Sequence, residues 1–179
     1  MSTVFIDVDT QLDFLYPAGA LYVPGAERII PAIARLSHHA AAEGIPLVST
    51  TDAHSENDPE FRVWPHHCVA GSLGQHKAQE TLVPGARQII VEKQIVDIWA
   101  APQFQRVIRE IAAGAYVVYG VVTEICVLYA VRGLLTLGKP VTIVTDAIET
   151  LSEPRGRQAL EEACSQGAAL STTARICAG

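Results

Sequence analysis

The feature that most constrains the fold of this chain is a regular alternation of short apolar runs with longer Ala- and Leu-rich runs. The apolar runs are rich in Val and Ile and are typical of strands buried on both faces. Each longer run is followed by a glycine, which commonly ends a helix. The alternation predicts an α/β fold, in which a doubly wound, mainly six-stranded parallel sheet carries helices on both faces, as in Rossmann-like proteins. We expect strands at 3–9, 45–51, 88–92, 116–122, 141–146 and 168–173, and helices at 25–43, 102–113, 124–137 and 155–166.

Two local features refine this prediction. Pro31 falls inside the first expected helix, so that helix should be kinked or should begin late. A polar stretch from Asp52 to about Val83 should form a long loop. A chain of 179 residues fits one domain, and we expect residues 1–179 to form it.

Composition narrows the class of protein. The formal net charge is -6 and no basic run occurs, which argues against nucleic acid as a partner. No stretch of 18 uninterrupted apolar residues occurs, so we expect no membrane span. The N-terminal run contains acids and lacks a basic segment, unlike a signal peptide. The four cysteines form no CxxC pair, and we expect reduced thiols in a cytoplasmic protein.

The predicted topology tells us where to look for a site. Ligands of doubly wound sheets bind beyond the carboxyl ends of the strands. The residues at those ends include many that could do chemistry: Asp9, Asp52 and His54, Lys93, 123–126, and Asp146.

Cys126 is the candidate nucleophile. Thr123 is a plausible N-cap, which would place Cys126 in the first turn of a helix. The free N–H groups and the helix dipole there would lower the pKa of the thiol and could bind an oxyanion. A buried structural cysteine is the plain alternative. Cys68, Cys164 and Cys177 lack this setting.

A reactive thiol needs a base or a cationic neighbour, and Lys93 and Asp9 are the candidates. Each ends an apolar strand, where a charged residue would need a partner. Asp7 is a rival, because it points to the same face of the strand as Asp9 and strand geometry does not separate the two. Asp13 fits a local hydrogen-bonding role instead. The pattern favours a Cys–Lys–Asp site.

A second group of residues is typical of a metal site. Asp52 and His54 are spaced i and i+2, so on extended backbone their side chains point the same way. His66 and His67 follow a dozen residues later and would supply a third ligand, and Glu60 could supply a fourth. This ligand set suits a catalytic Zn²⁺, Mn²⁺ or Fe²⁺ with open positions.

Taken together, these segments resemble the isochorismatase-like cysteine hydrolase superfamily, and within it the nicotinamidases. The resemblance covers most of the chain, from Val4 to about Leu151. The matching motifs occur in the family order: DTQLDF (9–14), TTDAH (50–54), DPEF (58–61), WPHHCV (64–69), VEK (91–93) and GVVTEICV (120–127).

The resemblance implies roles that spacing left open. It implies that Asp9, not Asp7 or Asp13, is the acid/base, and that Lys93 and Cys126 complete the triad. It also implies a cis Val121–Val122 peptide and an oxyanion hole formed by the N–H groups of Val122 and Cys126.

The same resemblance implies a divalent metal, with zinc favoured, bound by Asp52, His54 and His67 and with Glu60 as a possible addition. The family usually reads Trp-Pro-Pro-His, whereas here His66 replaces the second proline. His67 is favoured because it directly precedes Cys68. Three aromatic residues match positions around the substrate ring: Phe14, Trp64 and Trp99.

The implied activity is hydrolysis of nicotinamide to nicotinate and ammonia through a thioester, in an isochorismatase-type cysteine hydrolase domain. The implied setting is NAD salvage, in a homo-oligomer. The alternatives are another small amide, carbamoyl or ureido substrate, or a non-catalytic binding protein on the same scaffold. Relatives acting on carbamoyl or ureido groups generally lack the metal ligands. Isochorismatase itself needs no nucleophilic cysteine, so Cys126 argues against its vinyl ether chemistry.

Overall fold

A computed structural model describes residues 2–83 and 88–178. It confirms the six-stranded parallel sheet, whose strand order is β3-β2-β1-β4-β5-β6. The strands are β1 (Thr3–Val8), β2 (Leu47–Asp52), β3 (Gln88–Lys93), β4 (Ala115–Gly120), β5 (Val141–Ile148) and β6 (Ala169–Ser171).

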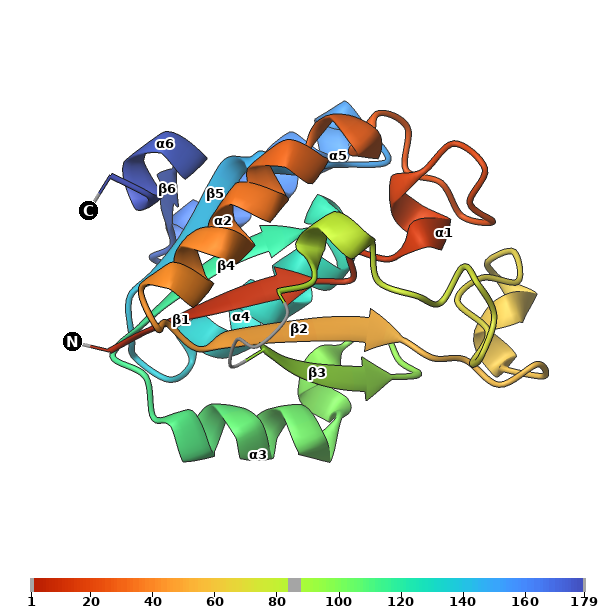
Figure 1. Cartoon of the computed structure of the whole chain (residues 1–179), viewed down its shortest axis with the longest axis horizontal. Coiled ribbons are helices and arrows are strands. Elements are labelled where there is room, and N and C mark those ends of the chain that lie inside the picture. Colours follow the sequence, from red (N-terminus) through yellow and green to blue (C-terminus); the bar gives the residue numbers. More distant parts are fainter. Residues whose placement is uncertain (1, 84–87, 179) are drawn as a thin grey trace.

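Helices cover both faces of the sheet (Figure 1). They are α1 (Leu12–Leu15), α2 (Ile30–Ala42), α3 (Pro102–Ile111), α4 (Leu128–Leu135), α5 (Glu153–Ser165) and α6 (Thr173–Ile176). Figure 1 shows α2 crossing in front of the sheet and α4 behind it. Within the described residues, no helix combines the length and the apolarity that a membrane crossing requires.

The most apolar runs of the sequence form the central strands of the sheet. Residues of β1, β2 and β4 are buried almost throughout, because helices pack against both of their faces. β3 and β6 are the edge strands and are more exposed, as Ile90 and Leu170 show.

The expected first helix does begin late. A short 3₁₀ turn, Ala26–Arg28, precedes α2, and Pro31 occupies the first turn of α2, where a missing N–H costs nothing. The expected helix 124–137 is divided, because a π-helical turn, Thr123–Val127, leads into α4.

Two expectations at the strand ends are wrong. Thr123 caps no helix, because its hydroxyl donates to the carbonyl of Glu149, 2.7 Å away. Asp146 does not end its strand, since β5 continues to Ile148. The Asp146 carboxylate instead accepts hydrogen bonds from the N–H and hydroxyl of Thr173, at 2.7 and 3.1 Å, and so holds α6.

The order of strands creates one reversal point, between β1 and β4. Connections from β1 run outward to β2 and β3, whereas β4 begins the half that continues to β5 and β6. A crevice forms beyond the carboxyl ends of the strands at such a point. Figure 1 shows the long loops gathered beyond the arrowheads of β1, β2 and β3.

A close approach of β1 and β4 depends on Gly120. Its φ is +116°, and a Cβ built there would lie 2.0 Å from the carbonyl oxygen of Val8. We therefore expect Gly120→Ala to lower the free energy of unfolding by about 3 kcal/mol, measured by urea denaturation.

Gly138→Ala is the matched control. Gly138 also has a positive φ, +65°, but a Cβ there would meet nothing within 4 Å. We expect Gly138→Ala to lower the free energy of unfolding by only about 1 kcal/mol. If both variants lose the same free energy of unfolding, the clash with β1 contributes nothing to the destabilisation of Gly120→Ala.

Candidate active site

Asp9 lies immediately after β1 and turns the chain out of the sheet. Its φ is +51°, a conformation that Asp adopts more readily than most residues. Its carboxylate is 1% exposed and accepts a hydrogen bond of 2.6 Å from the hydroxyl of Thr50, on the neighbouring strand. Strand and side-chain contacts thus hold the Asp9 carboxylate in one place.

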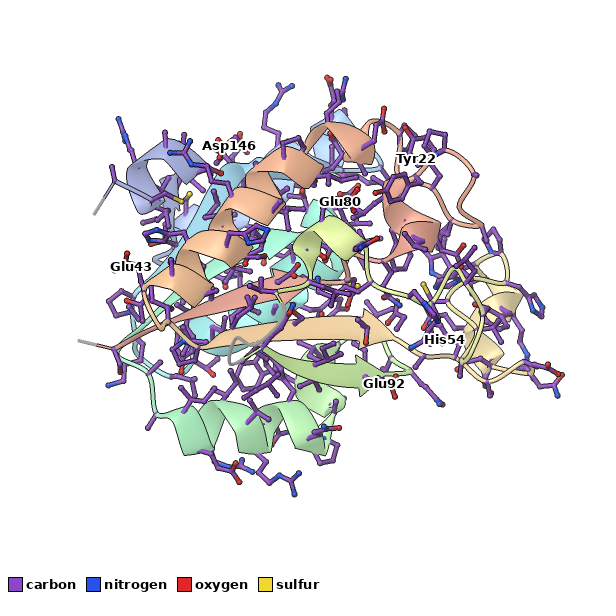
Figure 2. All side chains as sticks on the ribbon, viewed as in Figure 1. Tyr22, Glu43, His54, Glu80, Glu92 and Asp146 are labelled. Atoms are coloured by element: carbon purple, nitrogen blue, oxygen red, sulfur yellow. The ribbon has the colours of Figure 1, made fainter. Side chains whose placement is uncertain are left out.

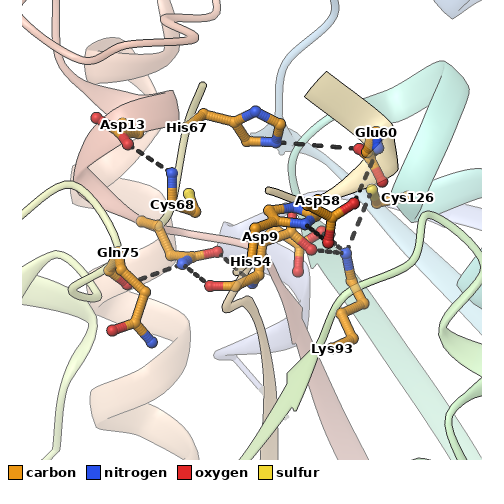
Figure 3. Close-up of polar contacts among 12 residues, drawn as sticks. Asp9, Asp13, His54, Asp58, Glu60, His67, Cys68, Gln75, Lys93 and Cys126 are labelled. Atoms are coloured by element: carbon orange, nitrogen blue, oxygen red, sulfur yellow. Dashed lines mark hydrogen bonds and ion pairs between the residues drawn. The ribbon is translucent and has the colours of Figure 1, made fainter. Parts of the chain in front are cut away.

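Lys93 is the last residue of β3 and lies in register with Asp52, the last residue of β2. Its ammonium is 2.9 Å from the Asp9 carboxylate, 3.8 Å from the Cys126 sulfur, and in contact with the Asp52 carboxylate. Figure 3 shows Lys93 reaching toward Asp9 and Cys126. The structure therefore brings together the three residues expected to form the Cys–Lys–Asp site.

The charges of this cluster depend on one another. Burial lowers the pKa of Lys93, but the Asp9 and Asp52 carboxylates outweigh it and raise the pKa well above its ordinary value. Burial raises the pKa of Asp9, and Lys93 opposes this without cancelling it. Burial also raises the pKa of Asp52, but Lys93 and His54 bring it below the ordinary value. Lys93 is thus a fixed cation, and Asp9 is a stronger base than an exposed aspartate.

The expectation of a low pKa for Cys126 is wrong. Burial raises the pKa of this thiol well above its ordinary value, and the Lys93 ammonium only partly offsets that. The Asp9 and Asp52 carboxylates raise it further. Cys126 therefore rests as a thiol, and it needs an adjacent base at the moment that it reacts.

The two rival aspartates lie elsewhere. Asp7 is fully buried and forms an ion pair with Lys77 and a 3.2 Å hydrogen bond with Ser49. Asp13 has the hydrogen-bonding role expected for it, accepting a local bond of 2.9 Å from the Ala20 N–H. It also accepts a 2.7 Å bond from the N–H of Cys68, in a distant loop.

The segment after β4 has the implied backbone geometry. The Val121–Val122 peptide is cis. Val122 and Cys126 both line the cavity next to Asp9. Within residues 2–83 and 88–178, the Val122 N–H donates to no protein acceptor. That N–H is therefore free to donate to a ligand.

The metal-ligand candidates also converge. Ligand atoms of Asp52, His54 and His67 lie within 4.8 Å of one another, and all three residues are buried. His66 is exposed and stacks on Phe61 instead, with ring centroids 4.2 Å apart. Figure 2 shows His54 beyond the arrowhead of β2.

Each histidine is oriented through its other ring nitrogen. Nδ1 of His54 is 3.0 Å from the Asp58 carboxylate, and Nδ1 of His67 is 2.7 Å from the Pro65 carbonyl. Both contacts leave Nε2 facing the cluster, and Nε2 of His54 is buried without a hydrogen-bond partner among the described residues. Burial lowers the pKa of His54, but the nearby Asp52 and Asp58 carboxylates outweigh it and raise the pKa to about 9. Oriented imidazoles in a negative environment fit a divalent cation.

Glu60 lies beside this cluster. Its carboxylate is 4.0 Å from Nε2 of His67 and lines the cavity. Burial raises its pKa.

Aromatic residues line part of a cavity of about 430 Å³ between the two groups of residues. Phe14 and Trp64 lie on its wall, as expected. Trp99 does not line it, which corrects its predicted role. Its indole N–H donates to the carbonyl of Ala130, 3.2 Å away, and its ring packs edge-on against Phe104. The wall includes residues that sequence reasoning missed: Leu21, Val23, Val96, Val121, Ile125 and Leu151.

Gln11 is a further residue whose role the sequence did not reveal. It is fully buried, and its side-chain amide binds the backbone of Asp52 on both sides. Its oxygen accepts from the Asp52 N–H and its nitrogen donates to the Asp52 carbonyl, each at 2.7 Å. The signal in the sequence was an amide side chain between the two acids of DTQLDF.

The fold and the cavity define the class of protein: a doubly wound α/β protein with a cysteine, a lysine and an aspartate at the reversal point of its sheet. The family model described as the isochorismatase domain matches residues 3–175, so the chain belongs to the isochorismatase family of hydrolases.

Individual relatives refine this assignment. The nicotinamidase of Escherichia coli K12 is 26% identical, with 93% of each chain covered. A pyrazinamidase structure from Pyrococcus horikoshii in complex with zinc has a TM-score of 0.89 and 28% identity, covering 96% of this chain and 99% of that one. An N-carbamoylsarcosine amidase structure from Thermoplasma acidophilum has a TM-score of 0.85 and 21% identity, with 97% of each chain covered, and shows the fold alone.

The position of Lys93 generates a prediction about Cys126. Because the Lys93 ammonium lowers the pKa of the thiol, Lys93→Met should raise that pKa further. We expect alkylation of Cys126 by iodoacetamide at neutral pH to be at least about tenfold slower, measured by peptide mass spectrometry.

Lys77→Met is the control. Lys77 is the other buried lysine with a carboxylate partner, but it pairs with Asp7. Lys77→Met should leave the alkylation rate of Cys126 within about twofold of its rate in the natural protein. An unchanged rate in Lys93→Met would mean that the ammonium does not influence the thiol.

Proposed function

We propose that this protein is a metal-containing cysteine amidohydrolase that converts nicotinamide to nicotinate and ammonia. The observation that carries the proposal is the single ammonium of Lys93 in contact with Asp9, Asp52 and Cys126 beside an aromatic-walled cavity. The similarity to a nicotinamidase and to a pyrazinamidase supports the choice of substrate.

The first half-reaction uses the resting thiol. Asp9 takes the proton from the Cys126 sulfur as that sulfur attacks the carboxamide carbon. Lys93 stays charged and stabilises the negative charge that develops on the sulfur as its proton passes to Asp9. The N–H groups of Val122 and Cys126 receive the oxyanion of the tetrahedral intermediate. Asp9 then gives its proton to the departing nitrogen, so ammonia leaves and a thioester remains.

The second half-reaction repeats these roles with water as the nucleophile. Water attacks the thioester carbon while Asp9 accepts a proton from it. The carbon–sulfur bond breaks, the sulfur recovers a proton from Asp9, and nicotinate is released. Asp9 therefore acts as base and then acid in each half, which suits a carboxylate whose pKa burial has raised.

Asp52, His54 and His67 would hold the divalent metal, with zinc the favoured ion and Glu60 beside them. When bound, the metal supplies a Lewis acid that binds a lone pair, such as that of a pyridine nitrogen, and fixes the ring. Phe14 lies next to these metal-ligand candidates, since its ring centroid is 5.5 Å from that of His67. Phe14 and Trp64 would then pack against a flat ring whose amide points toward Cys126.

The first test of this function is release of ammonia from nicotinamide by metal-replete protein. We expect turnover, and Cys126→Ala should lower it at least about 1,000-fold because it removes the sulfur that forms the acyl intermediate. Cys164→Ala, which changes an exposed cysteine, should leave turnover unchanged.

Other results would redirect the proposal. Full turnover in Cys126→Ala would refute the thioester. Cysteine-dependent release from a carbamoyl or ureido compound, with none from nicotinamide, would move the substrate to that class. No cysteine-dependent release from any amide would favour a binding protein.

The metal proposal has its own test. Asp58 orients His54, so Asp58→Asn should weaken zinc binding by about 10- to 100-fold, measured by competition with a chromogenic chelator. Asp97→Asn is the matched control, because both aspartates cap a 3₁₀ turn with a 2.9 Å bond to a backbone N–H. Only Asp58 also contacts a histidine. Equal zinc affinities for the two variants would remove Asp58 from the metal site.

A further inference from the structure

Two leucines line the reaction cavity, Leu21 and Leu151, and the proposed chemistry uses neither. Leu151 lies in the segment 149–152, which connects β5 to α5, and it is 36% exposed. Its side chain lines the cavity that contains Cys126 and Asp9. An apolar residue in such a place can limit what the cavity admits.

A groove of about 740 Å³ lies on the other side of this wall. The cavity and the groove share three lining residues: Trp64, Ile125 and Leu151. Beyond them the groove continues over Leu128 and along the face of α5 at Ala159. The three shared residues therefore form a partition between a small reaction cavity and a larger space.

Leu151 is held in the partition through its backbone. The N–H groups of Leu151 and Ser152 both donate to one carboxylate oxygen of Glu124, each at 3.1 Å. The other oxygen accepts a 2.5 Å hydrogen bond from the hydroxyl of Thr150.

A second pair of hydrogen bonds connects the same two segments, from the residue before Glu124. The N–H and the hydroxyl of Thr123 donate to the carbonyl of Glu149, at 2.8 and 2.7 Å. Thr123, Glu124 and Cys126 belong to the same π-helical turn. The turn that carries the nucleophile therefore also holds the segment that carries Leu151.

We propose that Leu151 is a specificity-determining residue that restricts the enzyme to amides of a single small ring, and that Glu124 is the residue that positions it. Amides with a second, fused ring are rejected because that ring would have to pass the partition into the groove. The inference rests on the proposed function for its substrates, and it deepens that function by giving the substrate class an upper size.

The experiment compares nicotinamide with quinoline-3-carboxamide, which keeps the pyridine nitrogen and the carboxamide and adds a fused ring. We expect the ratio of kcat/KM for the quinoline amide to that for nicotinamide to rise at least about tenfold in Leu151→Ala. The ratio should fall in Leu151→Phe, which fills the same space. Leu170→Ala, an exposed leucine on β6, is the control and should leave the ratio unchanged.

Variants of Glu124 separate positioning from general loss of structure. Glu124→Gln keeps an oxygen for both N–H groups and a group that can bond Thr150, so its ratio should stay at the natural value. Glu124→Ala should shift the ratio in the direction of Leu151→Ala, because the segment is released. If Glu124→Ala does not fold, Thr150→Val removes one of the same hydrogen bonds and should shift the ratio in the same direction.

A second readout does not depend on nicotinamide being the substrate. Cys126 is alkylated with iodoacetamide and with an iodoacetamide that carries a naphthyl group, and the two rates are compared by peptide mass spectrometry. Leu151→Ala should raise the relative rate of the bulky reagent at least about tenfold. If nicotinamide is not hydrolysed but this ratio rises, the proposed function fails and the role of Leu151 stands. If the ratio is unchanged in Leu151→Ala, the role of Leu151 is refuted.

Discussion

The contact of the Lys93 ammonium with two buried carboxylates is the interaction on which the rest of the site depends. Asp9 and Asp52 are 1% and 4% exposed, and burial of a carboxylate without a partner costs several kcal/mol. Lys93 is equally buried and supplies the opposite charge to both. The carboxyl ends of β1, β2 and β3 can therefore present two acids to one cavity, which like-charge repulsion would otherwise oppose. The same ammonium also reaches the Cys126 sulfur, so the group that stabilises the fold here is the one that acts on the thiol.

The order of the strands decides which residues this cluster can contain. β1 and β4 are neighbours at the reversal point of the sheet, with Val8 in register with Gly120. The chain leaves β1 at Asp9 and leaves β4 at the cis Val121–Val122 peptide, so an acid and the nucleophile turn begin side by side. β3 lies on the far side of β2, and Lys93 spans that distance only because its side chain is long and its strand ends level with Asp52.

Much of this arrangement could be predicted from the sequence, because apolar alternation and strand ends follow local rules. The rest depended on contacts between distant segments. Alternation predicts one strand face for Asp7 and Asp9, but β1 ends at Val8 and Asp9 leaves the sheet with a positive φ. The loop that brings Lys77 to Asp7 then separates their roles. Trp99 lies outside the cavity, where its indole packs against Gly133 on α4. A Cβ at position 133 would lie 1.9 Å from the indole nitrogen, so only glycine leaves room for the ring there. The surroundings that raise the pKa of Cys126 likewise arise only when the strand ends have come together.

Asp52 joins the two halves of the site. One of its oxygens contacts Lys93, and the other is 3.8 Å from Nε2 of His54, within the group of metal-ligand candidates. The side chain of Gln11 binds the backbone of Asp52 on both sides, so the position of this carboxylate is fixed from the backbone as well as from its charge partners. A shift of Asp52 toward either half would weaken its contact with the other. The residues that would orient a ring and the residues that would attack its amide are therefore held at one fixed separation, and that separation limits which amides can meet both at once.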